Sequence, residues 1–353
     1  MNTFQEERIS EINEIRSSMK QKVSPEEFEY SSLLGNGLFS STCKAVWKRP
    51  NEKEELVCIK QIELDHRMKL ENSSHEFDVL NSCTCNNIVT PLAFFISNKP
   101  IIPRTEEQKE SKEKEYAFLV IEYCDLGSLS SYIKKRYNDE LVPKQFVEHI
   151  FIETLSALWY LHSKRTILHR DIKPENILLQ TNPQATEEYP WPTVKICDFS
   201  FSRRISSEDE EMKTIVGTPL YMSPEIRSGK EYSYKIDLWS FAVTMYKVIS
   251  SQFPFGTQPK EFYHSLQKKV QPSFDNECWK EYLEMRNVLE HLFVYEEEER
   301  WGWEEIFENE YIQILLFEKK KREYQRRGID VSDDFIRNEI RSIHFQSIQT
   351  LIL

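Results

Sequence analysis

The chain has 353 residues, of which 39% are hydrophobic and 29% charged, as in a soluble globular protein with apolar cores and about two domains. Its formal net charge of −12 argues against a nucleic-acid-binding protein. No apolar run reaches the roughly 18 residues that a membrane span needs, and residues 1–15 are too polar for a secretory signal.

The first third of the chain predicts a helix followed by a sheet. Residues 1–23 carry apolar side chains at helical spacing among charges, which indicates a helix. Strand-like runs follow at 28–62, 92–96 and 116–123. A helix is predicted for 66–82. The charged stretch 97–115 shows no core residues, so we expect a flexible insertion there.

The remainder of the chain, from about residue 128, has a helical pattern. Short strands are predicted around 165–180 and 193–197, with a Pro-rich, turn-like insertion at 181–192 between them. Helical periodicity resumes near residue 235 and continues to the end. The sequence therefore predicts a small β-rich half and a larger helical half, with the boundary at 123–128.

The seven cysteines are scattered, and most lie inside apolar stretches. Cys83 and Cys85 are close together, but no second pair stands at a zinc-binding spacing. We therefore expect buried free thiols in a reducing compartment, which places the protein inside the cell, in the cytoplasm, the nucleus or both.

A glycine-containing turn separates the first two predicted strands in LGNGLFSST, residues 34–42. Gly35 and Gly37 would let backbone N–H groups approach phosphate groups closely. An ordinary hairpin turn explains the same two glycines equally well, so this turn alone indicates no function.

Two charged residues of the same half form a candidate pair. Lys60 closes the apolar strand VCIK, where an ammonium group needs an anion. Glu76 lies on the helix that follows, with Phe77 and Leu80 as apolar neighbours. Such a pair can hold the ammonium against phosphate oxygens. Each residue alone is also common as a surface charge.

The stretch LHRDIKPENILL, residues 168–179, concentrates polar side chains between hydrophobic anchors. Asp171 can accept a proton from a hydroxyl group, Lys173 can offset the charge of a transferring phosphate, and Asn176 offers an oxygen to a hard cation. Asp198 follows the predicted strand 193–197 and would supply a second oxygen ligand. Mg²⁺ favours one or two carboxylates together with substrate phosphates, and this set of residues suits that preference.

With these motifs in this order, residues 28–314 resemble a eukaryotic protein kinase. The pair HRDIKPEN and Asp198-Phe199 is a highly specific signature of that family. VCIK is similar to its strand-three Val-Ala-Ile-Lys motif, and Glu76 to its helix-C glutamate. Further similarities are SPE at 223–225 to Ala-Pro-Glu, DLWSFA at 237–242 to a large-lobe motif, and Arg300 to the arginine that pairs with the glutamate, here Glu225.

The resemblance implies an α+β, bilobal protein-kinase fold, with a small β-rich N-lobe and a larger helical C-lobe. We expect an N-terminal helical extension at 1–27, the kinase domain at 28–314 and a C-terminal helical tail at 315–353. Within the kinase domain, the N-lobe would span 28–123 and the C-lobe 124–314.

The resemblance also implies a role for each site residue, with ATP and Mg²⁺ as cofactors. Asp171 would be the catalytic base, and Lys173 would contact the γ-phosphate. Lys60, paired with Glu76, would position the α- and β-phosphates. Asn176 and Asp198 would bind Mg²⁺. The nucleotide contacts would be Leu34, Gly35, Gly37, Thr42, Cys58, Lys60, Glu122, Cys124 and Leu178, with Ile121 as gatekeeper.

The implied substrates are proteins with serine or threonine hydroxyls. Lys173 and the sequence GTPLYMSPE at 217–225 resemble the Ser/Thr type, in which Thr218 would hydrogen-bond toward Asp171 and Lys173. Glu175 is typical of kinases that prefer basic residues before the target. Lys247, however, replaces the second glutamate of many such kinases, which argues against a strong basic preference.

The resemblance further implies a phosphorylation switch. Arg170 matches an arginine that binds an activation-loop phosphate and so orders the loop. Thr214, four residues before Thr218, matches the common phosphosite, which an upstream kinase or autophosphorylation would modify. Ser206 and Ser207 are weaker candidates, because the acidic run 208–211 would repel a phosphate.

Several positions depart from the family pattern, and none of them removes a charged catalytic group: Ser40, Thr42, Cys58, Ser200, Ser223 and Ala242. Phe199 would be the aromatic residue that packs under helix C and switches the site. Ser200 stands where the family has a glycine. If the backbone there needs a positive φ, serine would cost on the order of 1 kcal/mol and would bias the movement of this segment.

Two hypotheses remain open for the function. The first is an active Ser/Thr kinase, and the second is a catalytically weak, kinase-like signalling scaffold. The retention of all five charged or polar site residues favours the first: Lys60, Glu76, Asp171, Asn176 and Asp198. The two terminal helical segments carry apolar residues at helical spacing, so each would dock on the kinase's own surface, bind a partner or self-associate.

Overall fold

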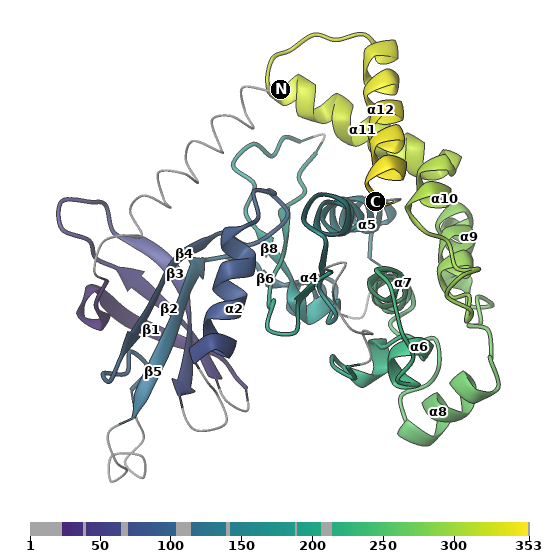
Figure 1. Cartoon of the computed structure of the whole chain (residues 1–353). Coiled ribbons are helices and arrows are strands. Elements are labelled where there is room, and N and C mark those ends of the chain that lie inside the picture. The colour runs from purple at the N-terminus through teal and green to yellow at the C-terminus, as the bar shows by residue number, and fades with distance from the viewer. Residues whose placement is uncertain are drawn as a thin grey trace. The chain divides into compact units, whose positions relative to one another are not determined.

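The computed structural model describes residues 23–37, 40–64, 70–103, 114–138, 142–187, 189–205 and 214–351 (Figure 1). Side chains are described for the same residues except 70–73, 259 and 343–351. The helix predicted for 1–23 lies outside this part of the chain apart from its last residue, and so do Ser206 and Ser207. The chain divides into two compact units.

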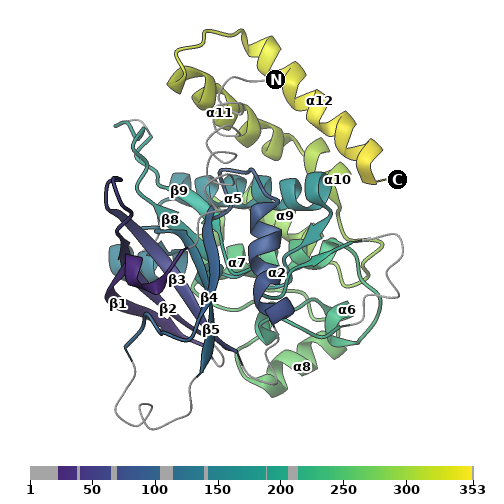
Figure 2. The ribbon, with the colours of Figure 1, turned by 60° about the vertical axis from the view of Figure 1, so that its left-hand side comes forward.

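The N-terminal unit comprises the described residues up to Asp125 together with Cys197–Ser200. Over these residues it contains an antiparallel sheet of five strands in the order β1-β2-β3-β5-β4. The strands are β1 (Phe28–Asn36), β2 (Ser40–Trp47), β3 (Glu55–Leu64), β4 (Pro91–Ser97) and β5 (Glu115–Glu122). Helix α2 (Leu70–Asn81) contacts β4 and β5 and lies along the sheet in Figures 1 and 2. A 3-10 turn, η1 (Pro25–Glu27), leads into β1.

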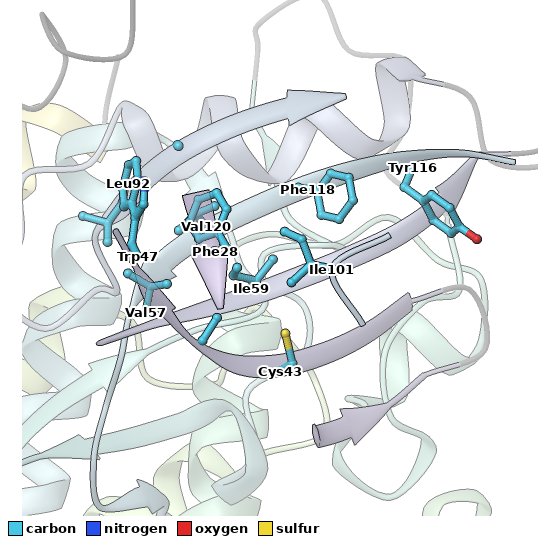
Figure 3. Packing of buried hydrophobic residues seen from close by; sticks show 12 residues of the cluster. Phe28, Cys43, Trp47, Val57, Ile59, Leu92, Ile101, Tyr116, Phe118 and Val120 are labelled. Carbon is cyan, nitrogen blue, oxygen red and sulfur yellow. The ribbon is translucent and has the colours of Figure 1, made fainter. Parts of the chain in front are cut away.

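An apolar cluster covers one face of this sheet (Figure 3). Val57 and Ile59 of β3 belong to it and are fully buried. Side chains alternate along a strand, so Cys58 and Lys60 project from the opposite face. On that face Phe77 of α2 stacks on Phe94 of β4, with ring centroids 5.6 Å apart. The alternation of β3 therefore aims Lys60 at the helix that carries Glu76.

The expectation that 97–115 contains no core residue is wrong at its start. Ile101 is 8% exposed and belongs to the apolar cluster of the sheet. The backbone N–H groups of Ile101 and Ile102 both donate to Oε1 of Gln61, at 2.9 and 3.1 Å. Residues 104–113 of the predicted insertion lie outside the described part of the chain.

The C-terminal unit comprises Leu126–Ile196 and the described residues from Phe201 onward. Its α-helices are α4 (Leu129–Tyr137), α5 (Lys144–Trp159), α6 (Pro224–Arg227), α7 (Lys235–Ser250), α8 (Pro259–Gln267), α9 (Leu283–Leu292), α10 (Trp303–Glu308), α11 (Glu310–Arg326) and α12 (Asp333–Leu351). Shorter helical turns are η2 (Tyr160–Lys164), η3 (Pro174–Asn176), η4 (Pro219–Tyr221) and η5 (Glu277–Glu281). The prediction that a small β-rich half precedes a larger helical half along the chain is confirmed.

Short strands frame the polar loops of the C-terminal unit. β6 (Gly127–Ser128), β8 (Ile177–Gln180) and β9 (Thr193–Ile196) form one small sheet, and β7 (Ile167–Leu168) pairs with β10 (Arg203–Arg204). The stretch LHRDIKPEN runs from β7 to β8. It is anchored at both ends by fully buried side chains, including Leu168 and Ile177.

The insertion at 181–192 connects β8 to β9 and packs on helices of the same unit. Trp191 lies 5.6 Å from Phe146 of α5, between ring centroids. Tyr189 contacts His149 of α5 through its hydroxyl group. The guanidinium groups of Arg322 and Arg326 on α11 lie 4.4 and 4.7 Å from the Tyr189 ring.

The last two helices form a hairpin that Figures 1 and 2 show at one side of the C-terminal unit. α11 contacts α5, and Lys319 forms an ion pair of 2.8 Å with Glu153. α12 folds back on α11 through a small apolar cluster of Tyr324, Ile336 and Ile340. In the described part of the chain, no helix is long and apolar enough to cross a membrane.

Candidate active site

The N-terminal unit contributes a partly buried ion pair on the α2 side of its sheet. Nζ of Lys60 donates to Oε2 of Glu76 at 2.7 Å and to Oδ1 of Asp198 at 2.9 Å. Burial acts to lower the pKa of Lys60, but the carboxylates of Glu76 and Asp198 outweigh it and raise that pKa above its usual value. The Lys60 ammonium group is therefore charged, and its two hydrogen bonds fix its orientation. A group that binds phosphate oxygens needs both properties.

The segment after β9 folds against this pair. Phe199 is fully buried, and its backbone N–H donates to Oε1 of Glu76 at 3.1 Å. Asp198 has a φ of 62°, in the left-handed region. Ser200 is not among the described residues with positive φ. The condition under which serine would strain this segment is therefore not met, because the unusual backbone conformation lies two residues earlier.

The predicted nucleotide contacts of the N-terminal unit lie on β1, β2, β3 and the end of β5. Thr42 is the cross-strand partner of Lys60, and Cys58 precedes Lys60 by two residues, so the three side chains share one face. Leu34 is 49% exposed. Gly37 donates its N–H to the Ser40 carbonyl at 2.7 Å. A Cβ at Gly37 would lie 3.3 Å from that oxygen, whereas a Cβ at Gly35 would meet nothing within 4 Å.

The end of β5 is fixed by two hydrogen bonds to one residue. The backbone N–H of Glu122 donates to the Thr90 carbonyl at 3.0 Å, and the Thr90 N–H donates to Oε1 of Glu122 at 2.7 Å. Ile121, the predicted gatekeeper, is partly buried, and Cys124 is 5% exposed. These bonds hold the chain rigidly where the predicted adenine contacts begin.

The C-terminal unit contributes a dense network around Asp171, which is 2% exposed. Its Oδ2 accepts from Nζ of Lys173 at 2.6 Å and from Nδ2 of Asn176 at 3.0 Å. Its Oδ1 accepts from the backbone N–H and the hydroxyl of Thr218, at 2.8 and 2.7 Å. Lys173 also donates to the Thr218 hydroxyl at 2.7 Å. The predicted contacts of Thr218 with Asp171 and Lys173 are confirmed.

A close backbone approach brings Thr218 to Asp171. Gly217 has a φ of 109°, and a Cβ at this position would lie 2.4 Å from the carbonyl oxygen of Arg170. No other residue type has room there, and L-residues rarely adopt that φ. The glycine of GTPLY is therefore required for the two loops to meet.

Asp237 on α7 holds the backbone that leads into Asp171, a role that the sequence analysis did not assign. It is fully buried, and its Oδ2 and Oδ1 accept the backbone N–H groups of His169 and Arg170, both at 2.8 Å. Oδ2 also contacts Nε2 of His162 at 2.9 Å. Burial raises the pKa of Asp237, but the contacts with His162 and His169 outweigh it and hold the pKa below its usual value. These bonds support Arg170, whose φ of 68° is unusual for a non-glycine residue. The aspartate that opens DLWSFA was the available signal.

Three other predicted residues lie in the C-terminal unit. Arg300 is 1% exposed and binds Glu225 through two hydrogen bonds of 2.6 and 3.1 Å, so the predicted pair is confirmed. Leu178 of β8 is partly buried and is the cross-strand partner of Lys195.

The side-chain oxygen atoms of Asn176 and Asp198 are of the chemical type that binds Mg²⁺. Asn176 donates its amide N–H groups to the carboxylate and the backbone carbonyl of Asp171, at 3.0 and 2.9 Å, which turns its Oδ1 atom to the other side. Asp198 offers a carboxylate in the N-terminal unit. Hard oxygen ligands of this type suit Mg²⁺. Within the described residues, no group of three or more His, Cys, Asp or Glu side chains could hold a metal by itself.

Comparison with protein-family models matches residues 28–312 to the protein kinase domain. The chain therefore belongs to the protein kinase family. The predicted bilobal fold is confirmed, with the sheet of the N-terminal unit and the helices of the C-terminal unit as its two lobes.

The curated relatives that match this chain include serine/threonine-protein kinases. The serine/threonine-protein kinase ULK3 of Xenopus laevis is 29% identical over 300 residues, covering 82% of this chain and 56% of that protein. The serine/threonine-protein kinase ATG1 of Kluyveromyces marxianus is 28% identical over 324 residues, covering 81% and 36%. Serine/threonine-protein kinase 36 of Mus musculus is 29% identical over 292 residues, covering 81% and 19%. All three relatives carry the name of the predicted Ser/Thr type, and this chain spans about half of the first relative and less of the other two.

Proposed function

We propose that the chain transfers the γ-phosphate of ATP to serine and threonine hydroxyls of proteins, with Mg²⁺ as cofactor. The network around Asp171 carries this proposal. A buried carboxylate that accepts hydrogen bonds from Lys173, Asn176 and Thr218 is preorganised, and it costs no reorganisation when a hydroxyl substrate arrives.

Each of the predicted site residues in the two units then has one task. Asp171 orients the acceptor hydroxyl and takes its proton. Lys173 offsets the charge of the γ-phosphate, and Lys60, held by Glu76, positions the α- and β-phosphates. Asn176 and Asp198 would hold Mg²⁺, which would supply positive charge to offset that of the phosphate oxygens.

The proposal assigns the adenine contacts of the N-terminal unit to the side chains of Leu34, Thr42 and Cys58 and to backbone groups of Glu122 and Cys124. In the C-terminal unit it assigns one adenine contact to Leu178. The support for this assignment is that Cys58 and Thr42 share the face of Lys60. Gly35 and Gly37 would let the turn between β1 and β2 approach the phosphates.

An autophosphorylation assay tests the proposed function. The full chain with ATP and Mg²⁺ should incorporate phosphate, and Asp171→Asn should lower the rate by at least about a hundredfold, because the hydroxyl loses its base. If the wild type binds ATP but never incorporates phosphate, the chain is a signalling scaffold and this proposal fails.

We also propose that phosphorylation of Thr214 activates the enzyme, whether an upstream kinase or the protein itself supplies the phosphate. Thr214 is exposed. Its carbonyl accepts from the Tyr232 hydroxyl at 3.3 Å, and that hydroxyl accepts from Nη1 of Arg170 at 3.1 Å. A phosphate on Thr214 would therefore be carried by a residue already linked to the Arg170 guanidinium, which precedes the catalytic base.

Substitution of Thr214 tests this switch. Thr214→Ala should lower the transfer rate about tenfold or more, because the loop loses charge-assisted bonds to Arg170. Thr214→Ser keeps the hydroxyl and should retain most of the activity. Equal rates for wild type and Thr214→Ala, with Thr214 phosphorylated in the wild type by mass spectrometry, would refute the switch.

We further propose that the kinase domain spans 28–314, between an N-terminal extension at 1–27 and a C-terminal tail at 315–353, in a protein that works inside the cell. The family match to 28–312 supports the domain limits. All seven cysteines lie within the described residues and none of them forms a disulfide bond, which supports a reducing compartment.

A further inference from the structure

The hydroxyl group of Ser200 lies inside the ion-pair network of the N-terminal unit. Nζ of Lys60 donates to Oγ of Ser200 at 2.7 Å. The same Oγ lies 2.5 Å from Oδ1 of Asp198 and 3.2 Å from Oε2 of Glu76. A glycine, which the family has at this position, would make none of these three contacts.

The number of protons fixes the direction of each bond. A hydroxyl group has one proton to donate and two lone pairs, an ammonium group only donates, and an ionised carboxylate only accepts. Ser200 therefore accepts from Lys60 and gives its single proton to one of the two carboxylates. The shorter contact assigns that proton to Asp198, and rotation of the hydroxyl would redirect it to Glu76.

We propose that Ser200 is a positioning residue whose hydroxyl ties the Asp198–Ser200 segment to the Lys60–Glu76 pair before nucleotide or cation binds. The roles of Lys60 and Asp198 in this inference rest on the proposed function. If Asp198 were engaged by a cation, the Ser200 hydroxyl would still accept from Lys60 and would have Glu76, at 3.2 Å, as its remaining acceptor. The segment thus keeps a link to α2 in both situations.

The Ser200 side chain could act through its hydroxyl group or by restricting the movement of the backbone, and the backbone conformation bears on this choice. Ser200 does not have a positive φ, so its Cβ causes no strain there. If the side chain acts through its hydroxyl, alanine and glycine at this position behave alike. If it acts by restricting a hinge, alanine behaves like serine and only glycine differs.

Hydrogen exchange on the full chain, without nucleotide and without divalent cations, tests the proposal. We expect the backbone amide of Phe199, which donates to Glu76, and the amides of α2 to exchange about tenfold faster in both Ser200→Ala and Ser200→Gly than in the wild type. Ser200→Thr keeps the hydroxyl and should retain wild-type protection.

Wild-type protection in Ser200→Ala, or failure of Ser200→Thr to retain protection, would overturn the proposal. Faster exchange in Ser200→Gly alone would also overturn it, in favour of a hinge effect. The measurement uses no ATP, so an inactive wild-type protein would refute the proposed function and leave this result standing.

Discussion

Lys247 on α7 lies beside Glu175, an exposed acidic side chain four residues after Asp171. Its Nζ lies 3.8 Å from Oε1 of Glu175, 3.0 Å from the Tyr221 hydroxyl and 4.7 Å from the centre of the Phe253 ring. Glu175 is two residues from Lys173, so under the proposed function a peptide whose hydroxyl reached Asp171 would pass close to this pair. The cation reduces the attraction of Glu175 for a basic substrate residue.

Substitution of Lys247 should therefore change substrate preference. In a peptide array, Lys247→Met should raise the relative rate for peptides with basic residues before the target by up to about fivefold, the range of a partly exposed ion pair. The double variant Lys247→Met/Glu175→Gln is the matched control and should lose the gain. An unchanged preference in the single variant would show that Glu175 does not contact substrate.

At the scale of elements, His149 joins α5 to the insertion at 181–192. Its Nε2 lies 2.7 Å from the Pro192 carbonyl, which can only accept, so Nε2 carries the proton and Nδ1 accepts from the Tyr189 hydroxyl. Burial lowers the pKa of His149 to about 4, and the nearby cations Lys319 and Arg322 act in the same direction, against Glu153. The native contacts thus require a neutral imidazole.

The need for a neutral imidazole predicts that the free energy of unfolding decreases when the pH is lowered through a defined window. The unfolded chain binds a proton at His149 below pH 6.5, whereas the folded chain does so only near pH 4, so the free energy of unfolding decreases as pH falls between these values. The loss from this residue is at most about 3 kcal/mol. Thermal melting should show a steeper decline for the wild type than for His149→Gln. Parallel curves for the two proteins would contradict the assignment.

Local sequence patterns identified the elements but not all of their contacts. The apolar run VCIK predicted the strand that the structure has as β3, and the alternation of side chains along that strand puts Lys60 on the face opposite Ile59. The charge of 97–115 concealed Ile101, because a single apolar residue in a polar segment carries no periodicity. The turn residues of 181–192 likewise gave no sign that Tyr189 packs between His149 and α11.

At the scale of the whole molecule, motif spacing predicted the protein kinase family and the pairs Lys60–Glu76 and Glu225–Arg300. The sequence did not predict two features of the site, because both depend on contacts between segments that are distant along the chain. Asp237 on α7 accepts the backbone N–H groups of His169 and Arg170, and the Ser200 hydroxyl accepts from Lys60. Asp237 had a sequence signal in the DLWSFA motif, but the motif does not say which backbone groups it binds, and the contacts of Ser200 leave no periodic signal.

The most direct test of the central claim is the identity of the residue that receives phosphate. Matched peptides that differ only in a serine, threonine or tyrosine acceptor are incubated with the full chain, ATP and Mg²⁺, and phosphate transfer is counted for each. We predict transfer to serine and threonine, little or none to tyrosine, and at least about a hundredfold loss for all acceptors in Asp171→Asn. Equal transfer by wild type and Asp171→Asn, or transfer to tyrosine alone, would contradict the account.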